Sequence, residues 1–307
     1  MLSLLTNAAA MTALQNLSQT NRNLEVTQNR ISTGLRVGSA SDNAAYWSIA
    51  TTMDSDKGAL ATVKDALNLG SANIDVATAG LNAALELSNE IKNKLVAATQ
   101  PGIDRTKVQD EITALQDQLR SVADSAVFSG QNWLSVDSSA ASYNAIRAVV
   151  ASYSRDNTGA ITINTIDIDI STKSLYDVNG NLGIIDQDRT VGGSTISVAA
   201  IDISALTDSA ADITTINEYV EIADAALTDI VSASSSLGAS KARVKTQQQF
   251  VKDLTDSITR GIGALVDADM TEESTRLQAL QVQQQLGVQS LSIANQNSQT
   301  ILSLFRG

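Results

Sequence analysis

The stretch from residue 277 to residue 305 contains no charged side chain. Apolar residues recur in it at three- and four-residue spacings, which is the pattern of a helix. An ordinary surface helix carries charges on its wet face, whereas this one offers glutamine, asparagine and serine. Such a helix suits burial among other helices, where its amides can be hydrogen-bonded. The first 21 residues share this character, because Arg22 is the first charged side chain.

Composition excludes several classes of function. Amide runs at residues 283–285 and 295–297 are too polar for a membrane span. The net charge of −12 argues against binding to nucleic acid or to an anionic membrane. The chain has no cysteine and no histidine, so disulfides, the usual zinc ligands, thiol nucleophiles and the commonest general base are missing. We therefore expect neither an enzyme nor a cofactor-binding protein.

The N-terminal segment, from about residue 4 to residue 35, has a heptad pattern. One row is Ala10, Leu17, Leu24 and Ile31, and the companion row is Leu14, Asn21, Gln28 and Leu35. Amides on a seam often fix the register and the number of partners. The pattern thus favours a specified assembly contact, and a plain two-helix core is the alternative. Residues 32–43 then form a hinge rich in glycine and serine, not a phosphate loop, because no strand precedes it.

A second helix is predicted from about residue 44 to residue 99, with two regular rows. One row is Leu60, Leu67, Ile74, Leu81, Ser88 and Leu95; the other is Val63, Gly70, Ala77, Ala84, Ile91 and Ala98. The small residues of the second row allow a neighbour to approach closely. Pro101 and Gly102 end this helix, and a shorter one folds back on it. Its apolar face is Val108, Ile112, Leu115, Leu119 and Val122.

The middle of the chain has a different texture. Residues 128–134 read as a small hairpin, and residues from about 137 to 206 form a β-rich insertion. Isoleucines alternate with polar residues between Ile161 and Ile170, while Asn179–Gly180 predicts a two-residue turn and Gly192–Gly193 another break.

The helical pattern resumes at about residue 213. Its main row is Ala223, Ile230, Leu237, Val244, Val251, Ile258 and Leu265. This helix matches the one from residue 44 in length, so the two are expected to lie side by side. Asp269 and Glu272 have the spacing of a capping box that begins the last helix. A metal site at Asp267, Asp269, Glu272 and Glu273 is the weaker interpretation, because carboxylates in a first helical turn already favour the macrodipole.

These patterns predict a mainly α fold, with long antiparallel coiled-coil-like helices from both chain ends, a small β-hairpin and a small β-rich central insertion. Three regions follow. The terminal helices comprise residues 1–43 and 268–307, and the long-helix domain with the hairpin comprises residues 44–140 and 208–267. The β-rich domain, which the resemblance described next implies is the outer one, comprises residues 141–207.

The two ends resemble a bacterial flagellin. The likeness rests on residues 31–37, 39–45 and 49–50 near the start, and on residues 267–270, 273–274, 284–285, 294–296 and 301–304 near the end. It covers about the first 135 and the last 95 residues, in the right order. The resemblance implies a homopolymer, the helical filament used for motility, with related flagellin subunits as possible co-subunits. It also implies a secreted, extracellular protein whose further partners are an export chaperone, the hook-junction proteins and the cap. The alternative is a hook–filament junction protein.

The seams and the resemblance together predict a polymerisation interface. Its residues are Leu14, Leu17, Leu24, Ile31, Leu35, Leu277, Leu280, Leu291, Ala294, Ile301 and Phe305. One departure concerns the innate Toll-like receptor for flagellin. Family members that it senses carry an arginine late in the first long helix, followed by Glu-Leu-Ala-Val-Gln. Residues 85–92 here contain no arginine, and the next one is Arg105. We expect weak or absent recognition.

Overall fold

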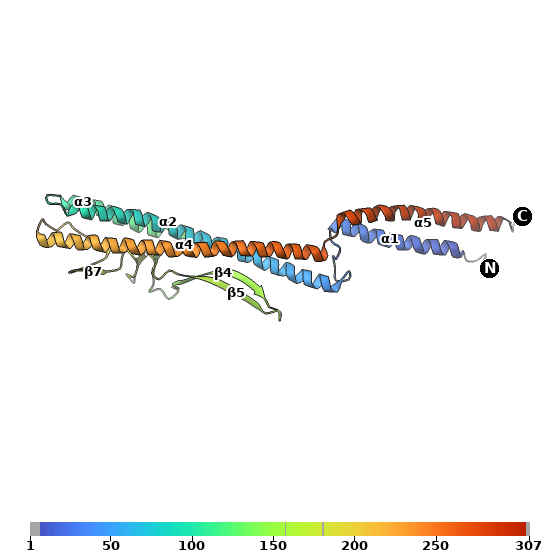
Figure 1. The fold of residues 1–307 in the computed structure, drawn as a ribbon, viewed down its shortest axis with the longest axis horizontal. Coiled ribbons are helices and arrows are strands. Elements are labelled where there is room, and N and C mark those ends of the chain that lie inside the picture. The colour runs from blue at the N-terminus through green and yellow to red at the C-terminus, as the bar shows by residue number, and fades with distance from the viewer. Residues whose placement is uncertain (1–6, 157, 180, 305–307) are drawn as a thin grey trace. The chain divides into compact units, whose positions relative to one another are not determined.

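The structure is a computed structural model that describes residues 7–156, 158–179 and 181–304, with side chains described as far as residue 296. Five helices dominate these residues: α1 (Ala8–Thr33), α2 (Ala44–Ala98), α3 (Arg105–Ser125), α4 (Ala210–Val266) and α5 (Met270–Leu304) (Figure 1). The mainly α fold class is confirmed.

Short strand pairs occupy the middle of the chain. They are β1 (Val127–Phe128) with β2 (Gln131–Asn132), β3 (Ser135–Val136) with β6 (Tyr176–Asp177), β4 (Ile146–Arg155) with β5 (Ile161–Asp169), and β7 (Arg189–Val191) with β8 (Ser194–Ile196). All pairs are antiparallel except β3–β6, and a 3-10 helix, η1 (Val198–Ala200), precedes α4. The predicted hairpin and β-rich insertion are both present.

The chain divides into two compact units. Unit 1 comprises residues 1–57 and 256–307, and unit 2 comprises residues 58–255. Each unit is described by itself below.

In unit 2, α2 and α4 run antiparallel, as the matching lengths predicted. Lys92 pairs with Asp224 at 2.5 Å, and 17 residues earlier on α2 Asp75 pairs with Lys241, 17 residues later on α4. An ion pair from Lys94 to Glu111 holds α3 against α2. All twelve residues predicted in the two rows of α2 are buried, and Leu67, Ile74 and Leu81 are fully so. The heptad prediction for α2 is confirmed.

Two glycines on α2 allow residues of the central segment to pack closely against the helix. A Cβ on Gly70 would lie 2.4 Å from Cγ1 of Val149 on β4, and a Cβ on Gly80 would lie 2.4 Å from Cδ1 of Leu134. The close approach predicted for the small row is thus realised by a strand at Gly70. A β-bulge between Val150 and Ser152 interrupts the β4–β5 ladder.

The two predicted turns differ in outcome. Gly192–Gly193 is the two-residue connection between β7 and β8, because Val191 pairs with Ser194. Of the other predicted turn, Asn179–Gly180, Gly180 lies outside the described residues, and beside it the Asn181 N–H donates to the Asp177 carbonyl. The strand before it, β6, pairs in parallel with β3 rather than with a following strand.

Candidate assembly surface

The terminal helices α1 and α5 pair in antiparallel fashion within unit 1. The Asn7 side chain donates to the Ala294 carbonyl at 2.9 Å, and the Gln284 amide donates to Oδ1 of Asn21 at 2.8 Å. Each helix turns one face toward the other. The facing residues are Ala10, Ala13, Leu17, Thr20, Leu24, Thr27 and Ile31 on α1, and Glu273, Leu277, Leu280, Gln284, Gly287, Leu291 and Ala294 on α5. Their alternating spacings of three and four make this a coiled-coil seam.

The companion row predicted for α1 does not face α5 within the chain. The residues beside the Leu17 row are Ala13, Thr20 and Thr27, whereas Leu14 is 57% exposed. The predicted Asn21 and Gln28 are exposed as well. The sequence argument followed the large apolar residues, but a close helix pair prefers small ones at the contact. Gly287 on α5 fits this explanation, since a Cβ there would lie only 3.2 Å from Cδ1 of Leu17.

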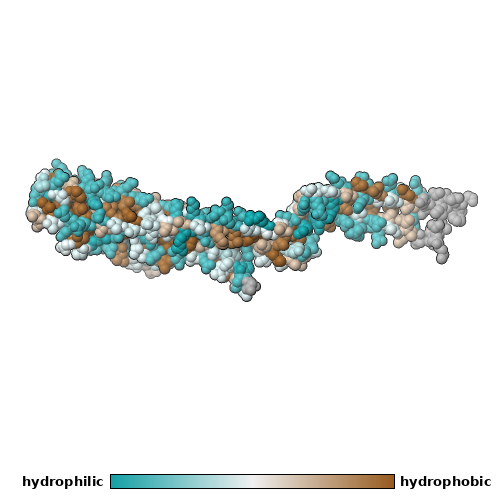
Figure 2. Space-filling view, viewed as in Figure 1, coloured by the Kyte–Doolittle hydropathy of each residue, from teal (hydrophilic) through white to brown (hydrophobic). Residues whose placement is uncertain are grey.

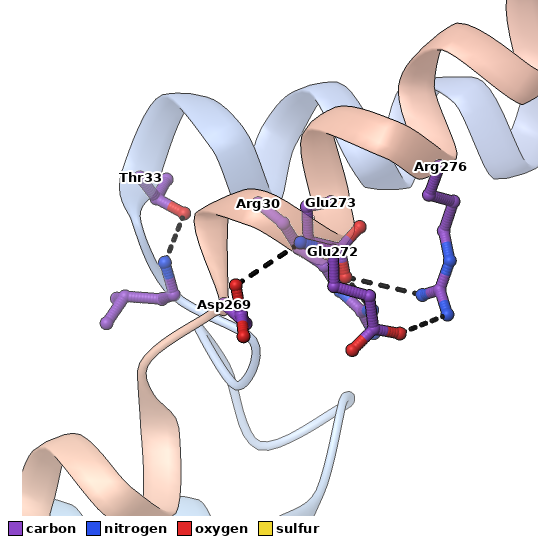
Figure 3. A network of polar contacts seen from close by, with 7 residues as sticks. Arg30, Thr33, Asp269, Glu272, Glu273 and Arg276 are labelled. Atoms are coloured by element: carbon purple, nitrogen blue, oxygen red, sulfur yellow. Dashed lines mark hydrogen bonds and ion pairs between the residues drawn. The ribbon is translucent and has the colours of Figure 1, made fainter.

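A carboxylate lies on the α5 seam itself. Glu273 is 4% exposed and precedes Leu280 by one heptad. Its Oε1 accepts from Nη1 of Arg30 on α1 at 2.9 Å and from Nη1 of Arg276 at 3.3 Å (Figure 3). The second oxygen, Oε2, has no partner among the residues that the structure describes. The sequence analysis treated Glu273 as a first-turn carboxylate, and the heptad spacing to Leu280 was the signal that it missed.

The N-terminus of α5 is capped by Asp269. Its Oδ1 accepts from the Thr271 N–H at 2.8 Å and from the Glu272 N–H at 3.2 Å. Backbone hydrogen bonds from Glu272 and then Thr271 lower the pKa of the Asp269 carboxyl. The reciprocal half of the predicted capping box is wrong, because the Glu272 carboxylate accepts from Arg276 at 2.8 Å instead. Within the described ranges, no group of three or more acidic side chains is arranged to hold a metal ion.

A joint connects this helix pair to the rest of unit 1. Leu35 forms an antiparallel bridge with Asp267, and Arg36 donates to the Leu265 carbonyl at 2.9 Å. The buried residues of the joint are Val37, Ala50 and Val266, with Leu35, Ile262 and Leu265 packed against them. Gly34, with φ of 73°, ends α1 in the left-handed conformation that glycine adopts without strain. The predicted hinge between helices is therefore a folded joint.

The predicted interface residues fall into four groups. Leu17, Leu24, Ile31, Leu277, Leu280, Leu291 and Ala294 face the seam between α1 and α5 of the same chain. Leu35 packs in the joint, and Leu14 is exposed. The side chain of Ile301 and the whole of Phe305 lie outside the described residues.

A second set of apolar residues on the helix pair was not predicted. These side chains are 49–65% exposed: Met11 and Val26 on α1, and Val282, Leu286, Val288 and Ile293 on α5. Figure 2 shows hydrophobic residues at the surface over α5. At 100° per residue, Val282, Leu286 and Ile293 share a face roughly opposite the Leu280 row. Their mutual spacing, taken apart from the seam rows, was the available signal. No described helix has the length and hydropathy needed to cross a membrane.

Comparison with known proteins now bears on this surface. The family model described as the bacterial flagellin N-terminal helical region matches residues 4–139, and that of the C-terminal helical region matches residues 220–305. The chain belongs to the bacterial flagellin family. These matches confirm the resemblance at both ends, and they leave unmatched residues 140–219, which contain β4 to β8.

Curated relatives agree over their full length. The chain is 41% identical to flagellin A of Rhizobium meliloti and 44% identical to flagellin C of its strain 1021, with both chains fully covered in each alignment. It is 42% identical to a flagellin of Brucella melitensis biotype 1, again with full coverage. This flagellin is a structural subunit of the flagellar filament, and nothing favours the hook-junction alternative.

Proposed function

We propose that this flagellin polymerises through its terminal helix pair. The seam closes α1 on α5 within one subunit, and the exposed apolar residues on the outer faces of both helices pack against other copies. The observation that carries the proposal is the uncharged outer face of α5, where Val282, Leu286 and Ile293 are each more than half exposed. An apolar side chain that becomes fully buried contributes about 1.5–3 kcal/mol, so many such contacts can hold a polymer.

The predicted interface residues enter this proposal in two ways. Leu14, Ile301 and Phe305 contact neighbouring subunits directly. The seam residues, such as Leu17 and Leu280, act indirectly, because they hold α1 and α5 in register and so fix where the outer faces lie. Residues 1–43 and 268–307 line the inside of the filament, the long helices of residues 44–140 and 208–267 surround them, and residues 141–207 face outward.

The proposal extends to export. A free subunit exposes apolar and amide surface on α1 and α5 before it meets another copy, and a chaperone in the exporting cell covers it. The protein is secreted by the flagellar export apparatus, meets the hook-junction proteins at the base of the filament, and is added beneath the cap.

Deleting residues 277–307 tests the proposed function. The truncated protein should remain soluble with the helices of unit 2 intact, and it should not polymerise on filament seeds. A finer variant is Leu286→Ser with Ile293→Ser, and its matched control is Val231→Ser, because Val231 is 51% exposed on α4 in unit 2. The double variant should lose seeded growth while the control keeps it. Filaments from the truncation, or equal growth of the double variant, would contradict the proposal.

The same structure supports weak recognition by the innate flagellin receptor. Glu86, Asn89 and Glu90 are the exposed residues of the relevant stretch, and none is basic. Arg105 cannot substitute, because it is 6% exposed and its Nη1 pairs with Asp208 at 2.8 Å. Purified monomer should not activate receptor-expressing cells at concentrations where a strongly sensed flagellin does. Equal activation would contradict this expectation.

A further inference from the structure

A hollow of about 320 Å³ lies between α2 and β4 in unit 2. Its lining is part apolar and part polar: Leu69, Gly70 and Asn73 from α2, Trp133 after β2, and Asn144 with residues 146–150 at and before β4. Trp133 is only 4% exposed, whereas Leu69 and Ile146 are 49% and 48% exposed. The hollow therefore has a buried aromatic side chain in its wall and apolar side chains open to solvent.

Arg147 is the basic residue of this lining. It pairs across the ladder with Ile168, which is 2% exposed, and it precedes the buried Val149 and Ala151 by two and four positions along β4. Since residues two apart on a strand share a face, Arg147 lies on the face that packs against the helices. Its Nε is buried without a hydrogen-bond partner among the described residues.

The other inward-facing arginines of the described chain each have a carboxylate. Arg30 pairs with Glu273, Arg105 with Asp208 and Arg189 with Asp229. No described carboxylate forms an ion pair with Arg147. A buried donor without a hydrogen-bond partner costs free energy, and a partly buried guanidinium without a carboxylate partner attracts an anion that can accept from it.

We propose that this hollow is a docking site for a carboxylate side chain of a second copy of this chain. The inference rests on the proposed polymerisation, and it adds a contact in unit 2 to those of the terminal helices. The charge balance identifies the occupant, because 33 acidic residues face 21 basic ones, so every neighbouring copy offers surplus carboxylates. A guanidinium binds a carboxylate through two parallel hydrogen bonds, and the apolar rim of Leu69 and Ile146 would keep water from the pair.

Variants at Arg147 separate this role from a structural one. Arg147→Gln should raise the critical concentration for seeded polymerisation about tenfold or more, because one partner of a desolvated charge pair is lost. Arg147→Lys should give an intermediate critical concentration, since lysine keeps the positive charge but cannot form the two parallel hydrogen bonds of a guanidinium. The matched control is Lys64→Gln, which removes an exposed charge from α2 and should change the value by about twofold at most.

The isolated monomer supplies the second measurement. Arg147 is partly exposed and its buried Nε has no hydrogen-bond partner among the described residues, so the Arg147→Gln monomer should keep its melting temperature or gain in it. A lowered melting temperature would show an internal partner and overturn the proposal. In a Trp47→Phe background Trp133 is the sole tryptophan. Its emission should shift on polymerisation with Arg147 present and not with Arg147→Gln.

Two further outcomes would overturn the proposal. One is polymerisation of Arg147→Gln at the wild-type critical concentration. The other is a rise in the monomer melting temperature with acetate or phosphate alone that requires Arg147, while Arg147→Gln leaves polymerisation unchanged. That result would identify the hollow as a site for small anions. If the wild-type chain itself failed to polymerise on seeds, the proposed function would fail instead, so the two failures are distinguishable.

Discussion

The α2–α4 body of unit 2 and the α1–α5 pair of unit 1 use the same heptad repeat to different ends. In the body, both rows of α2 are buried, and Leu67, Ile74, Leu81, Ile91 and Leu95 are completely so. In the terminal pair, the described seam residues that are buried are Thr27, Glu273 and Leu280, at 2%, 4% and 7% exposure, and two of the three are polar. The heptad spacing predicts which helix faces pack together. The residue types at those positions indicate whether the contact is fully buried within one chain.

The exposed faces strengthen this contrast. The terminal helices expose aliphatic side chains such as Met11 at 65% and Leu286 at 56%, with amides rather than charges beside them. The long helices of unit 2 carry ion pairs on their exposed faces, such as Lys92–Asp224. The helix core of unit 2 is therefore closed within one chain, whereas the proposed assembly is what would cover the exposed apolar face of the terminal pair.

The largest expected effect on the free energy of unfolding comes from truncating a leucine to alanine in each of the two regions. Leu81→Ala should lower the free energy of unfolding of the monomer by about 2–5 kcal/mol, because it opens a cavity in a closed core. Leu24→Ala, on the half-buried seam of α1, should lower it by about 1 kcal/mol or less. Urea unfolding of the two monomers measures both values. Equal losses would mean that the terminal pair is as complete as the body.

A smaller effect is expected from the buried carboxylate of the seam. Glu273→Gln removes the partner of Arg30 and should cost about 1–3 kcal/mol in the local stability of the α1–α5 contact. Glu272→Gln is the matched control, since the Glu272 side chain is 65% exposed and bonds only to Arg276 among described residues. It should cost about 0–1 kcal/mol. Hydrogen exchange at the Arg30 turn in filaments compares them, and similar costs would show that burial of Glu273 contributes nothing.

The smallest expected effects are changes in the stability of the monomer with pH. The Gly102 N–H and then Arg105 lower the pKa of Asp208 below its ordinary 3.8, so its stabilising contribution is present above that value and is lost as pH falls through the folded pKa. Burial raises the pKa of Asp186, so stability is gained as pH falls through its raised pKa. Asp208→Asn should thus lower the monomer melting temperature at pH 7, and the difference from the wild-type protein should shrink as the pH falls below 3.8. Asp186→Asn should show its greatest advantage at pH 7. A pH-independent difference in either variant would refute the assignment.

The long helices were predictable from sequence because large apolar residues recur at regular heptad spacing within each of them. The rows of α2 and the capping residue Asp269 needed only spacing and residue type. The residues of α1 that face α5 beside the Leu17 row, such as Ala13 and Thr20, were not predicted. Two heptad patterns compete in this helix, and the one with the larger residues Leu14 and Leu35 was chosen.

The parts that sequence did not predict depend on distant segments. The parallel pairing of β3 with β6 joins residues 41 positions apart, and the ion pair of Arg30 with Glu273 joins residues from the two ends of the chain. The unpaired state of Arg147 depends on which carboxylates the fold leaves out of reach, and spacing along one segment carries no information about that.

Hydrogen exchange of the same protein, first as a dispersed monomer and then as a filament, tests the central claim most directly. The account predicts fast exchange across α1 and α5 in the monomer and strong protection of both helices in the filament, while α2 and α4 within unit 2 are protected in both states. Full protection of α1 and α5 in the dispersed monomer, with no further gain on polymerisation, would contradict it.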